Sequence, residues 1–264
     1  MAFVGELFYV IFLSDAQALR VEIAEQRPQM SANPRFSHFK PVSSRMTVGE
    51  TVYRELRDAL SVGRFDPSQI LTIGAISEVF NTSHMPAREA LRRLVAEGAL
   101  DLGTNGSARV PAVDAERLDD ITEARVLLER RATQLAAERV DDDTIAEIDR
   151  LARIHAEVGN HRDIFDMLMR NRAFHFAIYE ASGSTVLPPL IESLWLQYGP
   201  YMRLLSDHLE LVHSKHGHEV YTAGHSDIVD ALRDHDAGRA ADAIEADIRR
   251  TRREMQSALA RMAG

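Results

Sequence analysis

The sequence NTSHMPAREALRRLVAEG, residues 81–98, predicts a short helix around which the neighbouring segments are organised. Its first three residues are common at helix N-caps, where their side-chain oxygens can accept hydrogen bonds from first-turn amides. Pro86 is acceptable there, because first-turn amides have no intrahelical partner. Strong helix formers then continue to Gly98, a residue type that often ends helices. Three apolar residues share one face and are expected to be buried: Leu91, Leu94 and Val95.

The early turns of this predicted helix are basic, with Arg88 and Arg92 one turn apart and Arg93 beside them. A helix dipole favours anions at the N-terminal end, so arginines there indicate an anionic partner. A nucleic-acid backbone or base edge fits this chemistry. Taken alone, the segment is also compatible with an ordinary amphipathic helix whose basic face is solvated.

The flanking sequence predicts two helices before this segment and a β-hairpin after it. The first helix follows a sequence at 47–50 that resembles a capping box, and the second spans 73–80. Short strands at 99–102 and 108–110 flank Asn105-Gly106, a dipeptide typical of hairpin turns. Three helices followed by a hairpin form a winged helix-turn-helix, in which one helix enters a DNA major groove and the wing lies along the backbone.

Length and composition limit the classes of protein that fit. The 264 residues are 45% hydrophobic, enough for two domains with cores of their own. The chain has no cysteine, which excludes disulfides and thiolate sites and fits a cytoplasmic location. Because the formal net charge is −9, any DNA-binding surface must be a local concentration of cations. No membrane partner is expected, since no apolar run reaches the roughly 18 residues of a membrane span.

The rest of the chain divides into an N-terminal arm and a helical bundle. Residues 1–44 are predicted to be a mobile arm, because a polar stretch punctuated by prolines follows a short apolar one. We therefore expect a winged domain at 45–112 and a helical domain at 113–264. Helices are expected at 114–140, 141–159, 161–182, 190–211, 219–236 and 238–262, with Ser206–His218 as an irregular stretch or helix end. The predicted fold class is mainly α: a winged helix-turn-helix with a small β-hairpin wing, then an all-α bundle of about six helices.

Residues 51–110 resemble the DNA-binding domain of the GntR family of bacterial transcription regulators. The resemblance lies in Leu71-Thr72-Ile73, in Ser83-His84-Met85-Pro86-Ala87-Arg88-Glu89-Ala90-Leu91-Arg92-Arg93-Leu94 and in the wing Asn105-Gly106-Ser107-Ala108-Arg109-Val110. It implies DNA contacts from the basic helix and the wing: His84, Arg88, Arg92, Arg93, Gly106 and Arg109. The family usually has arginine in place of His84, so an altered operator is expected from the loss of a permanently charged fork.

Residues 114–255 resemble the ligand-binding domain of the FadR subgroup of that family. The matching positions include Arg125, Glu129, Ala136-Ala137, Phe174-His175, Ala181-Ser182-Gly183 and His225. In the subgroup a pocket inside the bundle often holds a divalent metal, on an Asp and a His one turn apart and two His about 22 residues apart. The corresponding positions here are Asn171, His175, His225 and Asp247. The spacings of the subgroup are kept, and two of the residue types differ.

Two interpretations of this ligand set remain open. Two imidazoles, one carboxylate and one amide suit zinc, nickel, iron or manganese. The carboxylate stands on the last helix of the bundle instead of the third, which indicates a rearranged metal site. The alternative is a polar pocket with ordered water and no tightly held metal.

Arg125 is predicted to be interior, and a buried arginine needs a carboxylate partner or an anionic ligand. In the subgroup the matching arginine tends to face the carboxylate of the effector, which implies a small organic acid as the ligand. The alternative is an internal ion pair with Glu129, four residues later. Tyr201 and Arg203 are further candidates for lining the same pocket.

Three functions follow from these patterns. The leading hypothesis is a ligand-responsive transcription regulator, not an enzyme, that binds double-stranded operator DNA as a homodimer. A second is a metal-dependent hydrolase in which His175, His225 and Asp247 hold an ion that activates water. No nucleophile elbow, P-loop or HExxH motif accompanies that set. The third is a helical interaction module with no DNA role, which a salt titration separates from the first, because specific DNA binding falls steeply with salt.

Overall fold

The computed structural model describes residues 47–157, 164–211 and 224–263, which are mostly helical. The predicted N-terminal arm, residues 1–44, lies outside the described residues, as does the stretch 212–218 of the predicted irregular segment. Within the described residues, no helix is both long enough and apolar enough to cross a lipid bilayer.

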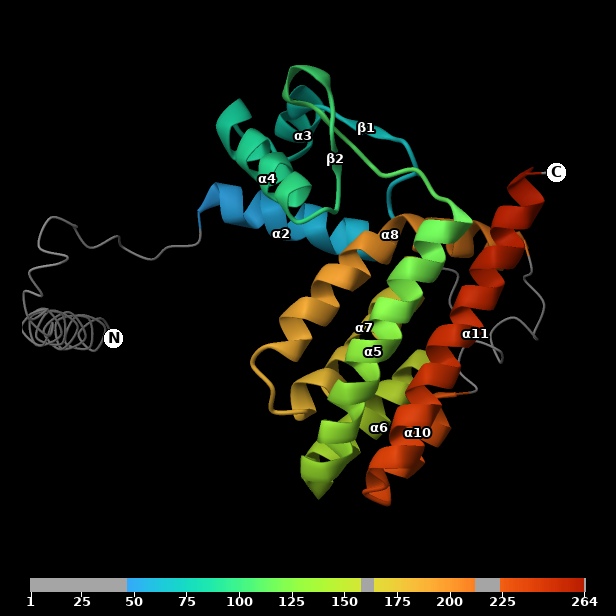
Figure 1. Cartoon of the computed structure of the whole chain (residues 1–264). Coiled ribbons are helices and arrows are strands. Elements are labelled where there is room, and N and C mark those ends of the chain that lie inside the picture. Colours follow the sequence, from blue (N-terminus) through green and yellow to red (C-terminus); the bar gives the residue numbers. More distant parts are fainter. Residues whose placement is uncertain (1–46, 158–163, 212–223, 264) are drawn as a thin grey trace, which may run out of the picture. The chain divides into compact units, whose positions relative to one another are not determined.

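The first part of the described chain is a winged helix-turn-helix (Figure 1). Three helices occur where the sequence predicts them: α2 (Val48–Ser61), α3 (Ile73–Val79) and α4 (His84–Ala96). The hydroxyls of Thr47 and Thr72 accept hydrogen bonds from backbone amides three residues later, at 3.1 and 3.2 Å, and so cap α2 and α3. Ser83 is the N-cap residue of α4, but its side chain makes no capping hydrogen bond. The side-chain cap that the sequence predicts for α4 is therefore absent at Ser83.

The wing is part of a sheet with three strands of two residues each: β1 (Ile70–Leu71), β2 (Asp101–Leu102) and β3 (Ala108–Arg109). The strands are antiparallel and their order is β1-β3-β2. Asn105 and Gly106 turn the chain between β2 and β3 with φ values of 55° and 78°, as the Asn-Gly signal predicts. The sequence does not predict β1, because two residues are too few to show an alternating pattern.

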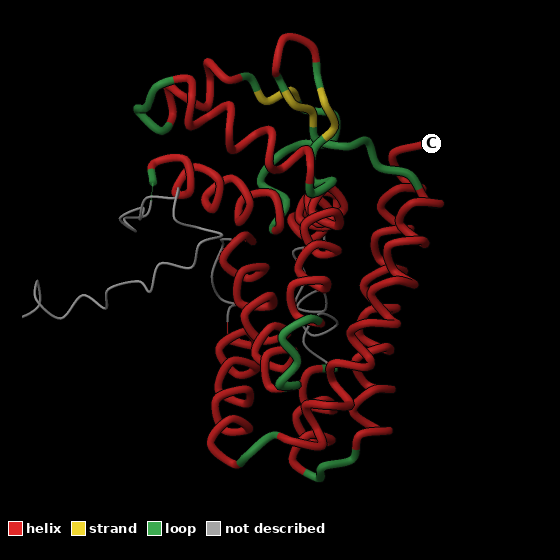
Figure 2. Tube along the Cα trace, turned by 60° about the vertical axis from the view of Figure 1, so that its left-hand side comes forward, coloured by secondary structure: helices red, strands yellow, loops and turns green. Residues whose placement is uncertain are grey.

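The second part is a bundle whose described helices are α5 (Ala115–Arg139), α6 (Asp142–Glu157), α7 (Ile164–Ala181), α8 (Leu187–Leu211), α10 (His225–Arg233) and α11 (Ala237–Ala263). Helix α5 packs against α11, α8 and α7 and is the central helix (Figure 1). Among the described residues, strands occur only in the winged part (Figure 2). Because α8 continues to Leu211, residues 206–211 of the predicted irregular stretch are a helix end.

Three hydrophobic clusters of the described residues include side chains of α8, and the third lies around Tyr198 and Met202. The bundle core surrounds the buried side chains of Phe174, Tyr179 and Trp195, and the core of the winged part includes Leu196 of α8. Helices α2 and α8 approach closely at Gly199, where a Cβ atom would lie 2.0 Å from the carbonyl oxygen of Leu60. Only glycine permits this approach, which joins the winged part to the bundle.

Candidate functional site

The residues predicted to contact DNA are all exposed on α4 and the wing. Arg88 and Arg92 of α4 line a hollow of about 270 Å³ together with Gly106 of the wing. On the face of α4 that packs inward, Ala87 and Leu94 are fully buried, as expected for an amphipathic helix. The helix thus offers two arginines to solvent beside the wing, which is the arrangement that entry into a DNA groove requires.

Arg93 differs from the other arginines of α4, because its guanidinium is already engaged. The group lies 3.6 Å above the ring centroid of Tyr53. It also forms ion pairs with Glu50 (Nη1–Oε2 2.8 Å) and with Glu97 (Nε–Oε1 3.3 Å). These contacts hold α4 against α2, so Arg93 acts in the positioning of the helix.

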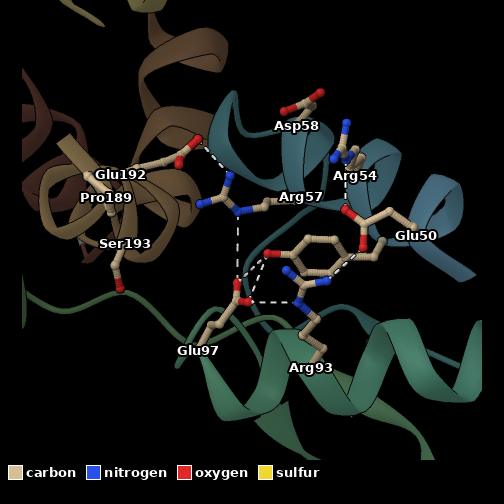
Figure 3. Close-up of a pocket in the computed structure, with 10 residues that line it drawn as sticks. Glu50, Arg54, Arg57, Asp58, Arg93, Glu97, Pro189, Glu192 and Ser193 are labelled. Atoms are coloured by element: carbon tan, nitrogen blue, oxygen red, sulfur yellow. Dashed lines mark hydrogen bonds and ion pairs between the residues drawn. The ribbon is translucent and has the colours of Figure 1, made fainter. Parts of the chain in front are cut away.

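A polar cleft of about 560 Å³ lies between α2, α4 and α8 (Figure 3). Glu192 of α8 forms ion pairs with Arg57 of α2 and Arg172 of α7, each at 2.6 Å. Burial would raise the pKa of the Glu192 carboxyl, but the hydrogen bonds and charges of the two arginines outweigh burial and lower it. Ion pairs therefore connect the C-terminal end of α4 to the bundle through Glu97, Arg57 and Glu192. No sequence pattern indicates this cleft, because the residues that line it are distant in the chain.

The centre of the bundle holds a buried ion pair between Arg125 and Glu129. The Nε and Nη2 atoms of Arg125 donate to the two carboxylate oxygens of Glu129, at 2.6 and 3.3 Å. Glu129 also accepts hydrogen bonds from the indole of Trp195, at 3.0 Å, and from the hydroxyl of Tyr179. Burial would lower the pKa of Arg125, but the charge and hydrogen bonds of Glu129, together with the nearby Tyr198 and Tyr179, outweigh burial and raise it. The internal ion pair between Arg125 and Glu129 is thus present, and Arg125 also lines a small cavity.

The predicted metal ligands converge beside this ion pair. One donor atom each from His175, His225 and Asp247 lies within 4.8 Å of the other two, and all three residues are buried. A small cavity beside them is lined by His175 and Asp247, and also by Asn171 and Arg125. The cavity measures about 20 Å³, room for roughly one water-sized particle. These residues could therefore hold a metal ion in the present geometry, whereas a larger ligand requires side chains to move.

The hydrogen-bond partners of His175 leave a lone pair on its Nε2 atom that can bind a cation. The single hydroxyl hydrogen of Tyr179 is donated to Glu129, so His175 Nδ1, 3.2 Å from that hydroxyl, carries the hydrogen of their contact. Burial and the neighbouring His225, Arg125 and Arg250 hold the pKa of His175 well below its ordinary value, so the ring is neutral near pH 7. Its Nε2 lone pair then faces the Asp247 carboxylate at 3.4 Å. A lone pair opposite a carboxylate is satisfied by a cation between them.

Two of the residues expected to line the effector pocket lie elsewhere. Tyr201 donates a hydrogen bond of 3.0 Å to the carbonyl oxygen of Asp114, at the start of α5. Arg203 forms an ion pair of 2.7 Å with Asp66 of the winged part. Helix α8 instead turns Trp195, Tyr198 and Met202 toward the cavity. Tyr201 and Arg203 directly precede and follow Met202, and neighbouring residues of a helix point in different directions, so neither side chain faces the cavity.

One histidine of this region was not predicted. His155 of α6 is fully buried, and its Nδ1 atom lies 3.3 Å from Nδ1 of His225. It continues the inward face of α6 formed by Ile145, Ile148 and Ala152. Because His155 continues the apolar face of α6, the sequence pattern could have predicted a buried polar side chain at this position.

A winged helix-turn-helix with exposed arginines defines the class of helix-turn-helix DNA-binding regulators. Residues 48–110 match the family described as bacterial regulatory proteins, gntR family, and residues 120–250 match the FCD domain. The chain belongs to the GntR family of bacterial transcription regulators. The resemblance seen in the sequence is thereby confirmed, as is the mainly helical fold class.

Named relatives and a solved structure agree with this assignment. The chain is 33% identical over 154 residues to the HTH-type transcriptional regulator McbR of Escherichia coli (strain K12), covering 58% of this chain and 70% of McbR. It is 28% identical over 180 residues to the HTH-type transcriptional repressor GlaR of the same strain, covering 65% of this chain and 82% of GlaR. The solved structure of E. coli McbR/YncC superposes with a TM-score of 0.71 and 28% identity, covering 81% of this chain and 96% of that chain.

Family membership decides between the three functional hypotheses. The members are transcription regulators rather than enzymes, so the hydrolase alternative is excluded. The interaction module without a DNA role is excluded as well, because the matched winged segment is the DNA-binding domain of the family.

Proposed function

We propose that the protein is a homodimeric, ligand-responsive regulator that binds a pseudo-palindromic operator. Residues 45–112 form its DNA-binding domain, and residues 113–264 form its effector-binding and dimerisation domain. The observation that carries the proposal is the exposed pair Arg88 and Arg92 beside the wing, on a helix whose opposite face is buried. A homodimer places two such helices on successive major grooves, and the half-sites are then one helical turn apart or a multiple of it.

In this proposal Arg88 and Arg92 contact bases or phosphates, His84 contacts DNA from the first turn of α4, and Gly106 and Arg109 contact the backbone from the wing. The exposure of all five residues supports these roles. Arg93 supports DNA binding indirectly, because its ion pairs with Glu50 and Glu97 orient α4.

His175, His225 and Asp247 would hold a divalent cation, with the Asn171 amide as a neutral fourth group. Imidazole and carboxylate donors suit zinc, nickel, iron or manganese. The opposed His175 lone pair and Asp247 carboxylate support this role. A bound cation supplies a Lewis-acidic position next to Arg125, to which the carboxylate of an effector can bind.

The effector in this proposal is a small organic acid that reaches Arg125. The guanidinium of Arg125 is buried between Trp195 and Tyr198, at 4.6 and 4.5 Å from their ring centroids. Since the cavity has room for little more than a water molecule, an organic acid enters only if side chains of the bundle move. A ligand that selects this opened arrangement changes DNA affinity, provided that the two arrangements bind DNA unequally.

Selection from a random duplex library, followed by titration of the selected duplex, tests the DNA-binding part. We expect enrichment of an inverted repeat and an affinity that falls steeply between 50 and 200 mM salt, as phosphate contacts require. Analysis of zinc, nickel, iron and manganese in protein purified without chelator tests the metal part. If no repeat is enriched, the proposal that the protein binds an operator as a dimer is wrong, whatever the metal content.

A further inference from the structure

The imidazole ring of His155, a residue outside the predicted ligand set, meets the ring of the predicted ligand His225 inside the bundle. Their Nδ1 atoms are 3.3 Å apart, and their ring centroids are 4.9 Å apart. The exposed fractions of the two residues are 0% and 2%. His155 comes from α6, whereas the predicted ligands come from α7, α10 and α11.

Each of the two predicted histidine ligands has one nitrogen engaged by the protein and one nitrogen open to the ligand group. His175 uses Nδ1 for Tyr179 and turns Nε2 toward Asp247. His225 uses Nδ1 for His155, and its buried Nε2 has no hydrogen-bond partner among the described residues. A nitrogen that makes a hydrogen bond is unavailable to a metal, so Nε2 is the available donor on both rings.

We propose that His155 is a positioning residue for the cation site, because it accepts the Nδ1 hydrogen of His225. A neutral imidazole has one ring hydrogen, so a hydrogen on Nδ1 leaves the lone pair of His225 on Nε2. His155 thereby fixes both the tautomer and the orientation of His225. Histidine ligands of metals usually make such a contact to a carboxylate, carbonyl or water, and here an imidazole takes that role.

The inference rests on the proposed cation site and adds a residue outside the predicted ligand set to it. The variant His155→Phe keeps a ring and removes the acceptor, whereas His155→Asn offers an amide oxygen near the position of Nδ1. Phe174→Leu is the matched control, because Phe174 stacks on His225 at a centroid distance of 4.2 Å without a hydrogen bond. Thermal unfolding of each variant verifies that it folds.

Titration with zinc sulfate against a chromogenic chelator measures the effect on metal affinity. We expect His155→Phe to weaken zinc binding about 10- to 100-fold, the usual effect of losing such a supporting contact. His155→Asn and Phe174→Leu should both remain close to the wild type. Equal affinity for wild type and His155→Phe would overturn the proposal, as would equal losses in His155→Phe and Phe174→Leu.

A second measurement needs no variant and no metal. Nitrogen-15 spectra of the imidazole rings in metal-free wild-type protein report which nitrogen of His225 carries hydrogen. We expect the hydrogen on Nδ1, and a hydrogen on Nε2 would overturn the proposal even if zinc binds. If the wild type binds no zinc, the metal part of the proposed function fails, while the spectrum still decides the His155–His225 hydrogen bond. Neither the zinc titration nor the nitrogen-15 spectrum depends on operator binding, which is measured separately.

Discussion

At the scale of single residues, Glu129 connects the polar side chains at the centre of the bundle. Its carboxylate accepts hydrogen bonds from Arg125, Trp195 and Tyr179, and it is fully buried. The spacing of four residues predicted the pair with Arg125 as one of two alternatives. The other two donors lie 50 and 66 residues away in the sequence, and only packing brings them together.

Replacement of Glu129 by Gln should destabilise the fold strongly. The substitution keeps the shape of the side chain but leaves the Arg125 charge buried without its counter-ion, which costs about 3–5 kcal/mol. The free energy of unfolding in urea measures the loss. The matched control is Glu147→Gln on α6, whose ion pair with Arg150 is half exposed and should contribute nothing measurable. Similar losses for the two variants would mean that the buried pair has no special role.

Arg88 and Arg93 stand five residues apart on α4 and should respond differently to truncation. Arg88→Ala should weaken binding of the selected operator by about 1–3 kcal/mol if the side chain contacts a base, with no change in melting temperature. Arg93→Ala should instead lower the melting temperature, because the contacts of Arg93 with Tyr53, Glu50 and Glu97 are lost. Fluorescence anisotropy and thermal unfolding separate the two effects. Unchanged DNA affinity in Arg88→Ala would remove that residue from the interface.

Secondary-structure elements are connected here by charges as well as by apolar contacts. Along α2, Glu50 pairs with Arg93 of α4, and Arg57 pairs with Glu192 of α8. The sequence predicted all three helices, and it did so for α2 and α4 from local signals of cap, apolar period and stop residue. It did not predict which charges of one helix meet those of another, because that depends on the close approach of α2 and α8 at Gly199.

The junction between α2 and α8 should weaken in acid. In the folded protein the arginines outweigh burial and lower the pKa of Glu192 from 4.5, so the folded state binds fewer protons than the unfolded state. This contribution to stability is complete above about pH 5 and is lost as the pH falls through the lowered pKa. Urea unfolding from pH 6 to pH 3 should therefore show a smaller acid-induced loss for Glu192→Gln than for wild type. Glu55→Gln, an exposed carboxyl on α2, is the control and should match the wild type.

Over the whole molecule, the parts predicted best are those with signals inside one segment. The winged fold follows from a turn dipeptide, two helix caps and a basic amphipathic helix, all within residues 47–110. The convergence of His175, His225 and Asp247 was expected from their spacings in the resemblance. The sequence did not indicate the contact of His155, or that Tyr201 contacts Asp114 instead of lining the cavity, because helices distant in sequence decide which side a bundle residue faces.

A regulator of the proposed kind must couple ligand binding in the bundle to DNA binding by the winged part, and such coupling is reciprocal. If zinc at His175, His225 and Asp247 changes operator affinity by some factor, the operator must change zinc affinity by the same factor. Couplings of this kind are typically about 5- to 150-fold. We expect anisotropy titrations of the operator with and without zinc, and zinc titrations with and without operator, to give one common factor.

The control for this coupling is Asp247→Asn, which removes the carboxylate of the site. It should weaken zinc binding and bring operator affinity in zinc to the zinc-free value. Zinc that binds tightly but leaves operator affinity unchanged would be a structural ion of the bundle. Any change in operator affinity would then have to come from the organic acid alone. To reach Arg125, the acid must enlarge the existing cavity of about 20 Å³.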